Sequence, residues 1–320
     1  MSSENTYVQQ IQYNNQDLNL ELLRSLTLTR SVNALAPFVV IRFLNPHNTL
    51  LEDVKLREME ELSIRLMDST SDDDAEIIKA IICDIKQDVN NANILVLECM
   101  ERSAYYLSQK DTRIFFKESV PTILKALSPG LKIECGDFPA HQTYNLSNRR
   151  RFGLIAQMAR EMGAIVFIQS GTLVFKTKEE LLKTKHIADY EYQNPGAVYQ
   201  IRQPKLLNRN YTQTEEKRSY IGWHIEKGLV KSTQNKEYPT KMVNCDEVGK
   251  LDNLSKSLTP TVSFITLGEG KLKVGSSLKL TWHTGIAERP LDESYPNRVL
   301  IGDLVMHTEN KFTCTVGGYI

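Results

Sequence analysis

The sequence predicts an α+β fold in which two strand-rich halves flank a short α/β insert. One observation is that apolar and polar residues alternate, as in half-buried strands, in runs near both ends of the chain. Another is a pair of amphipathic helical patterns between residues 119 and 163. The third is length, because 320 residues suffice for one large domain or for two to three small ones.

The N-terminal part opens with a polar segment and continues into strands. We expect residues 1–17 to form a flexible or partner-bound arm, because they are mostly polar. Residues 38–43 predict a β-strand that ends at the turn-forming residues 45–48. The run over residues 54–67 alternates like a strand at its end, although its start could be helical.

A long β-hairpin is predicted next. Residues 76–89 and 94–100 are apolar strand-like runs, and Asn90-Asn91 lies in the turn between them. A short helix is expected over residues 102–109. The first strand-rich domain is therefore predicted to span residues 18–110.

The first half of the insert, which is predicted over residues 111–185, has clear local signals. Residues 113–116 form a short apolar strand, and Ser119 can cap a following helix because its hydroxyl accepts from a free backbone N–H. Pro121 lies in the first turn, where its missing N–H costs nothing. Pro129-Gly130 should end this helix. Its apolar face comprises Val120, Ile123, Leu124 and Leu127.

The second half of the insert predicts another helix and a hairpin. Ser147 or Asn148 can cap the helix, and Gly163 should close it. Residues 164–169 and 172–175 are apolar runs separated by Ser170-Gly171, which is a two-residue hairpin signal. The predicted apolar helix face comprises Phe152, Ile155, Ala156 and Ala159.

The C-terminal domain is predicted over residues 186–320. Residues 231–260 are polar with little periodicity, and we expect them to form a long excursion that is either functional or disordered. Residues 272–282 contain two short alternating pieces around Gly275. Residues 299–307 and 311–316 predict a hairpin.

Composition disfavours several classes of protein. The 39 basic and 39 acidic residues balance, whereas a nucleic-acid binder usually has a basic excess. The triplet Arg149-Arg150-Arg151 is interpreted as a solvated helix start or a partner contact. No stretch approaches the about 20 apolar residues of a membrane span. Five scattered cysteines without a CxxC motif argue against disulfides and structural zinc, and Cys83, Cys99 and Cys314 are predicted to be reduced core residues.

No constellation for catalysis, cofactor binding or metal binding stands out, so the predicted set of such residues is empty. His307 is interpreted as a hydrogen-bonded strand residue rather than a metal ligand. The acidic groups at Glu58, Glu60 and Glu61 and at Asp72–Asp74 are interpreted as solvated surface rather than a glycosidase pair. Trp223 and Trp282 are predicted to be packing anchors, with a partner contact as the alternative.

Three stretches resemble one known family. They are DTRIFFKESVPTILKAL, RRRFGLIAQMAREMGAIVFIQSGTLVFKT, and the C-terminal strands that include LIGDLVMH and FTCTV. Together they resemble the baseplate hub proteins of contractile phage tails, which include the late control gene D proteins and the hub portion of type VI secretion spike proteins. His307 stands at a position where that family has histidine, whereas Leu304 departs from the usual valine.

The resemblance implies an α+β fold with two small β-barrel-like domains and an inserted α/β segment. It further implies a homotrimeric structural ring, without enzymatic activity or cofactor, that adapts the six-fold tail tube to the three-fold central spike. The expected partners are sister copies, the central spike as a separate chain, the tail tube or its initiator, and baseplate wedge proteins. No membrane and no specific nucleic acid are expected. The predicted location is the virion tail baseplate, after synthesis in the host cytoplasm.

Two other functions remain open at the level of sequence. One is a tail-associated hydrolase that degrades the cell wall. The other is an off-axis tail adaptor that shares the hub fold.

Overall fold

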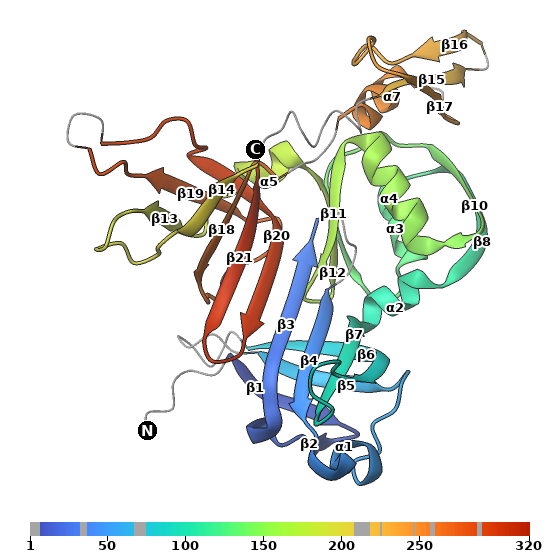
Figure 1. Cartoon of the computed structure of the whole chain (residues 1–320). Helices are drawn as coiled ribbons and strands as arrows, with labels where there is room; N and C mark the ends of the chain where they lie inside the picture. The colour runs from blue at the N-terminus through green and yellow to red at the C-terminus, as the bar shows by residue number, and fades with distance from the viewer. Residues whose placement is uncertain are drawn as a thin grey trace.

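The computed structural model describes residues 7–32, 37–66, 75–207, 218–224, 226–245, 247–256, 260–286 and 290–320. Its main feature is a curled sheet of 13 strands, which makes the protein mostly β (Figure 1). The strand order is β14-β18-β21-β20-β3-β4-β7-β6-β5-β1-β2, and β19 adds to β20 with β13 beside it.

The N-terminal half of this sheet contains seven of the described strands. They are β1 (Val8–Tyr13), β2 (Gln16–Asp17), β3 (Leu23–Ser31), β4 (Phe38–Leu44), β5 (Glu61–Leu66), β6 (Glu76–Gln87) and β7 (Ile94–Glu101). Three short helical turns connect some of them, namely η1 (Leu20–Leu22), η2 (Pro46–Asn48) and α1 (Thr49–Glu52). The predicted β6–β7 hairpin and the following helix α2 (Arg102–Ser108) are confirmed.

The expected N-terminal arm is wrong for residues 8–17. Strand β1 pairs antiparallel with β5, and Ile11 and Tyr13 are fully enclosed in the core. The physical reason is that every second or third residue of this polar segment is apolar, so one face can be buried although the composition is polar. Residues 1–6 lie outside the described residues.

The C-terminal half contains six further strands. They are β13 (Asp189–Tyr192), β14 (Arg202–Leu206), β18 (Val262–Leu267), β19 (Ser277–Trp282), β20 (Arg298–Thr308) and β21 (Phe312–Tyr319). Strands β20 and β21 form the predicted C-terminal hairpin. The two strand-rich halves share one sheet, because β20 pairs with β3 from Asp303 opposite Ser31 to Thr308 opposite Leu26. The division into two barrel-like domains stays a prediction, since strand pairing continues across this junction and one apolar core includes residues of both halves.

The insert is a separate layered unit with its own apolar core. It comprises β8 (Lys110–Glu118), α3 (Val120–Leu127), β9 (Lys132–Cys135), β10 (Gln142–Arg150), α4 (Arg151–Met162), β11 (Ala164–Gln169), β12 (Thr172–Thr177) and α5 (Lys178–Lys183). Helices α3 and α4 lie between the three-stranded sheet β11-β12-β9 and the two-stranded β8–β10 ribbon (Figure 1). The predicted cap at Ser119, the αL residue Gly163 and the hairpin at Ser170-Gly171 are confirmed.

The predicted N-cap of the second helix is wrong. Neither Ser147 nor Asn148 caps α4, because β10 continues to Arg150, which pairs with Lys110 and is itself the N-cap residue without a side-chain hydrogen bond. Asn148 adopts a positive φ of 47° at the irregularity in the ribbon. Long-range strand pairing therefore outweighs the local capping preference.

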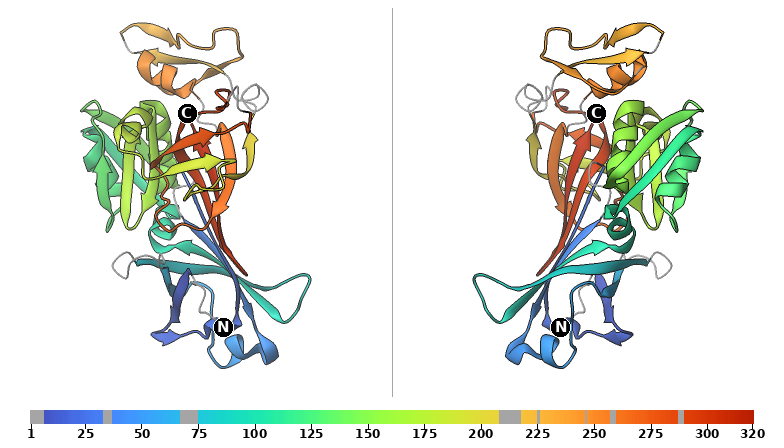
Figure 2. Two further views of the ribbon diagram at one scale, coloured as in Figure 1. Left: turned by 90° about the vertical axis from the view of Figure 1, so that its left-hand side faces the viewer. Right: turned by 90° about the vertical axis from the view of Figure 1, so that its right-hand side faces the viewer.

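The polar excursion is ordered over its described residues. Strands β15 (Ser219–His224), β16 (Gly228–Lys231) and β17 (Thr240–Met242) form a small sheet, and helix α7 (Val248–Leu254) follows it. This unit lies at one end of the molecule next to α4 (Figure 2). Of the two expectations for residues 231–260, disorder is wrong for the described residues.

Candidate functional site

The outward face of the β8–β10 ribbon carries two exposed apolar side chains. Ile114 is 76% exposed and Phe116 is 68% exposed, whereas Phe115 between them is buried against the helices. On β10, Tyr144 and Leu146 are buried on the same inner side. Because side chains alternate across a strand, a continuous apolar run gives a ribbon with two apolar faces. Among the described residues, only the inner face of the ribbon is covered.

Charged residues lie close to this apolar run in the chain and at the end of the ribbon. Asp111 is flanked by Arg113 and Arg151, each with its Nε 3.1 Å from the Asp111 carboxylate. Lys117 Nζ lies 5.4 Å from the centre of the Phe116 ring, which is a cation–π distance. Of the basic triplet, Arg149 and Arg150 are exposed, while Arg151 is engaged by Asp111. The triplet therefore contains both a solvated part and a structural ion pair.

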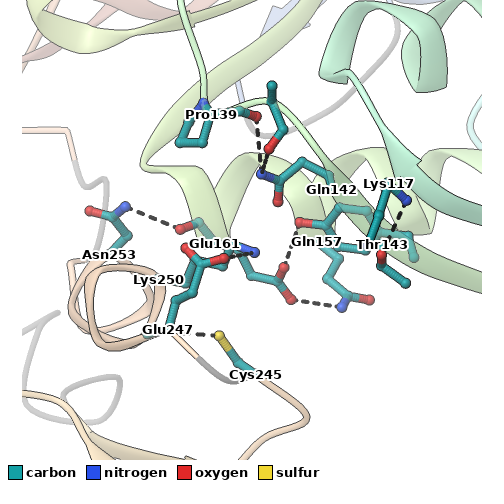
Figure 3. Close-up of polar contacts among 12 residues, drawn as sticks. Lys117, Pro139, Gln142, Thr143, Gln157, Glu161, Cys245, Glu247, Lys250 and Asn253 are labelled. Atoms are coloured by element: carbon teal, nitrogen blue, oxygen red, sulfur yellow. Dashed lines mark hydrogen bonds and ion pairs between the residues drawn. The ribbon is translucent and has the colours of Figure 1, made fainter. Parts of the chain in front are cut away.

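A polar hollow of about 280 Å³ lies where the excursion meets the insert (Figure 3). At its wall Glu161 is only 6% exposed, and both of its carboxylate oxygens accept hydrogen bonds. The Tyr144 hydroxyl donates over 2.8 Å and the Gln157 amide over 2.7 Å. Burial, followed by the negative charge of Glu161, raises the pKa of the Tyr144 phenol. The phenol therefore stays protonated and remains a donor.

The excursion is fastened to the insert by polar contacts from α7 and the segment before it. Asn253 Nδ2 donates to the Glu161 carbonyl over 3.1 Å. Lys250 Nζ lies 3.0 Å from Glu247 and 6.0 Å from the centre of the Tyr144 ring (Figure 3). The side chain of Lys250 is only 15% exposed, so this contact is partly removed from solvent.

These groups give recognition chemistry rather than a catalytic pair. Among the described residues, Glu161 is the one carboxylate that lines the hollow, and both of its oxygens already accept hydrogen bonds. Hydrolysis of a glycosidic bond needs two acidic groups on opposite sides of the substrate. Within the part of the chain that the structure describes, no three His, Cys, Asp or Glu side chains are grouped as metal ligands.

The acidic residues considered as a glycosidase pair do not come together. Glu60 accepts from the Tyr13 hydroxyl, and Glu61 accepts from Arg102 over 3.0 Å. Glu58 is exposed. Asp72–Asp74 lie outside the described residues.

The two tryptophans have different environments. Trp282 is 3% exposed, and its indole N–H donates to the Pro296 carbonyl over 2.8 Å, so the packing prediction is confirmed there. Trp223 is 62% exposed, so the same prediction is wrong for it. His307 is hydrogen-bonded through Nδ1 to Thr27 at 2.8 Å, as predicted for a structural strand residue.

The predicted core cysteines also divide. Cys99 and Cys314 are buried, and burial raises the pKa of Cys99 to about 12, which keeps its thiol protonated. Cys83 is exposed, so the core prediction is wrong for this residue. It lies at an irregularity in the pairing of β6 with β7, which changes the side chain's direction.

Sequence reasoning missed the outward direction of Ile114 and Phe116. The run Ile114-Phe115-Phe116 indicates an apolar strand but does not tell which side chain faces the helices. The signal that was available is the strict alternation of side chains along a strand. If Phe115 faces the helices, as Leu146 does on the neighbouring strand, then Ile114 and Phe116 must face away from them.

Comparison with known proteins establishes the fold. The tail protein from Neisseria meningitidis MC58 matches with a TM-score of 0.67 at 10% identity, over 97% of this chain and 95% of that chain. The 43 kDa tail protein of prophage MuSo2 from Shewanella oneidensis matches with a TM-score of 0.63 at 8% identity, over 97% of each chain.

A third similar structure comes from a secretion machine. The E. coli c3393 protein, a type VI secretion component with structural similarity to the T4 bacteriophage tail proteins gp27 and gp5, matches with a TM-score of 0.55 at 8% identity. The match covers 97% of this chain and 76% of that chain.

No protein-family model and no curated protein sequence matches. Among the described helices, none is long and apolar enough to cross a membrane. The chain therefore has the fold of these tail and secretion proteins.

Proposed function

We propose that this protein is a structural hub subunit in the baseplate of a contractile phage tail or a related injection machine. The observation that carries the proposal is the likeness to tail proteins over nearly the whole of both chains. A likeness of that extent includes both strand-rich halves and the insert, so it is not a match to one common supersecondary unit. The expected location is accordingly the virion tail, at the baseplate.

The proposed mechanism is geometric. Three copies form a closed ring, and the two strand-rich halves of each copy give six similar units around the axis. Hexameric tail-tube rings can then dock on one side, while the three-fold central spike docks on the other. The β3–β20 pairing supports this mechanism, because it joins the halves by a continuous ladder of backbone hydrogen bonds. A rigid junction fixes the angle between the halves, which such an adaptor requires.

The ribbon face around Ile114 and Phe116 is our candidate for the contact between neighbouring copies. Ile114 and Phe116 are two residues apart on one strand, so their exposed side chains lie next to each other on one face, and adjacent exposed apolar groups favour a protein contact. Lys117, whose Nζ lies 5.4 Å from the centre of the Phe116 ring, can contribute to a polar rim. The spike, the tube or its initiator, and wedge proteins remain the other expected partners.

Native mass spectrometry tests the ring directly. We expect a trimer, either of the purified full chain alone or of the chain mixed with the spike protein of its own machine. A monomer under both conditions contradicts the proposal. Electron microscopy of the particle with this chain labelled then separates an axial hub from an off-axis adaptor, because only the hub lies on the symmetry axis.

A further inference from the structure

We propose that the free edge of β10 is a docking groove for an extended acidic segment of a partner protein, which adds to the β8–β10 ribbon as a third strand. The inference goes beyond the hub proposal and does not depend on it. It concerns the side of the insert that faces the excursion, not the apolar ribbon face.

Strand β10 has one unused edge. It pairs with β8 from Gln142 opposite Glu118 to Arg150 opposite Lys110, and none of the described strands pairs with its other side. In an antiparallel strand, alternate backbone N–H and C=O groups point to each side. Over Tyr144–Leu146, where the pairing with β8 is regular, the groups on the free side of β10 therefore form a row of donors and acceptors, and such a row is where an extended peptide can add to a sheet. Register shifts between Gln142 and Tyr144 and between Leu146 and Arg149 bound this row.

Two hollows run along this free edge. The first, of about 280 Å³, lies between β10, α4 and the excursion residues Asn244, Cys245 and Lys250, and the second is about 190 Å³. Asn145, Arg149 and Gln157 border both hollows, so the two hollows lie next to each other, and together we call them the groove. Along β10 the groove reaches from Thr143 to Arg149, which corresponds to about 20 Å at the rise of a strand. That length accommodates a strand of about six residues.

The charges of the groove select the occupant. Arg149 and Arg160 line it, both are exposed, and neither forms an ion pair with a described carboxylate. The Arg160 Nε donates to the Ala156 carbonyl, which orients the guanidinium without neutralising it. Glu161 does not compensate these charges at the surface, because it is buried and held by Tyr144 and Gln157.

Lys250 also lines the groove at its excursion end, but its charge is paired with Glu247, so the two arginines carry the unpaired positive charge. The remaining β10 lining is uncharged, namely Thr143, Tyr144, Asn145 and Ser147 in the first hollow and Asn145 and Leu146 in the second. Arginines present paired donors that match carboxylates. A strand whose alternate side chains are Glu or Asp therefore fits the charges, and a strand of apolar side chains does not.

The test uses the full-length protein and a defined probe. The probe is a fluorescently labelled peptide of alternating Glu and Thr, and its binding is followed by fluorescence anisotropy at low and at physiological salt. We expect saturable binding that weakens with salt, and no binding of the matching Lys-Thr peptide. Amide hydrogen exchange is expected to slow in β10 when the Glu-Thr peptide is present.

Two changes separate strand addition from simple charge attraction. The first change is N-methylation of alternate residues of the Glu-Thr peptide. Two versions are made, one methylated on the Glu residues and the other on the Thr residues. Each version keeps the charge of the parent peptide but loses its backbone donors on one side. We expect one version to bind at least about tenfold more weakly than the parent peptide. The double substitution Arg149→Glu and Arg160→Glu is expected to weaken the parent peptide by at least about tenfold.

The matched control is Arg24→Glu, an exposed arginine of β3 that lies in the main sheet, outside the insert. It makes the same type of charge change and is expected to leave the affinity within about twofold of the wild type. Thermal unfolding of each variant establishes that it is folded.

Four results overturn the proposal. The first is that the Glu-Thr peptide does not bind at about 1 mM. The second is that both N-methylated peptides bind as tightly as the parent peptide, and the third is that R24E loses as much affinity for the parent peptide as the double variant does. The fourth is that the protein binds single-stranded DNA of similar length as tightly as the Glu-Thr peptide. The last result assigns the groove to phosphate recognition instead.

Discussion

The guanidinium of Arg30 lies 2.6 Å from the carboxylate of Glu76, in a contact where Arg30 is 4% exposed. Ser170 donates to the same Glu76 oxygen over 3.1 Å. Arg30 belongs to β3, Glu76 begins β6, and Ser170 is at the turn of the β11–β12 hairpin. The ion pair thus connects two strands of the N-terminal half, β3 and β6, and the hydrogen bond from Ser170 connects them with the insert.

Removing one partner of this pair is expected to destabilise the fold strongly. Glu76→Gln leaves the buried Arg30 guanidinium without its ion-pair partner, and the expected loss is about 3–5 kcal/mol of unfolding free energy. Urea denaturation measures the loss. The control is Glu61→Gln, which removes the partner of Arg102 in an exposed pair and is expected to cost less than about 1 kcal/mol. Equal losses in the two variants contradict the assignment.

Glu101 gives the stability a dependence on pH. Burial raises the pKa of its carboxyl, and this effect outweighs the hydrogen bond from Ser103 and the charge of Arg30, which lower it. The folded state therefore binds the proton more tightly than the unfolded state. The ionised Glu101 therefore lowers the unfolding free energy. This loss is fully present above the pKa that Glu101 has in the folded state, and it disappears as the pH falls from that pKa toward the ordinary value of 4.5.

We expect Glu101→Gln to raise the unfolding free energy at neutral pH and to flatten its dependence between pH 4.5 and neutrality. Denaturation curves recorded at several pH values measure this. The control is Glu58→Gln, in an exposed side chain, for which the pH profile should match that of the wild type. A destabilised E101Q protein at neutral pH rules the explanation out.

The hydroxyl of Tyr144 is expected to stabilise the junction between the ribbon and α4. Tyr144→Phe leaves one oxygen of the buried Glu161 without its donor, which should cost about 1–3 kcal/mol of unfolding free energy. Tyr105→Phe is the matched control, because the Tyr105 hydroxyl has no hydrogen-bond partner among the described residues. Calorimetry on both variants compares them, and a neutral Y144F protein is the contrary result.

Gly222 should be required for the excursion to fold. A Cβ at this position would lie 1.7 Å from the Cys245 carbonyl oxygen, and a backbone atom cannot move away by rotating a side chain. Gly222→Ala is therefore expected to loosen residues 219–256, which limited proteolysis and hydrogen exchange detect. Gly153→Ala in α4 is the control, since nothing lies within 4 Å of its added Cβ. That variant should gain up to about 1 kcal/mol from helix propensity.

The ribbon face can be tested for self-association without harming the fold. Ile114→Asp and Phe116→Asp change side chains that are 76% and 68% exposed, so the subunit's thermal stability should change little. If this face joins neighbouring copies, the double variant should dissociate into monomers in native mass spectrometry at concentrations where the wild type is trimeric. Val198→Asp, at an 87% exposed position outside the ribbon, is the control. An intact trimer in the double variant assigns the subunit contact elsewhere.

Local chemistry in the sequence determined several elements of this protein. Ser119 caps α3, Gly163 closes α4, and Ser170-Gly171 turns the β11–β12 hairpin, because each of these preferences depends on residues that are neighbours in the chain. The predicted β6–β7 and β20–β21 hairpins were confirmed for the same reason.

Only the tertiary structure decided the pairing of β3 with β20, the direction of Ile114 and Phe116, the exposure of Trp223 and Cys83, and the groove beside β10. Each of these depends on segments that lie far apart in sequence. A strand carries the same pattern whichever neighbour it pairs with, and a face is exposed only when no distant segment covers it. The sequence therefore specified which residues can be buried, and the packing of distant segments determined which of them are.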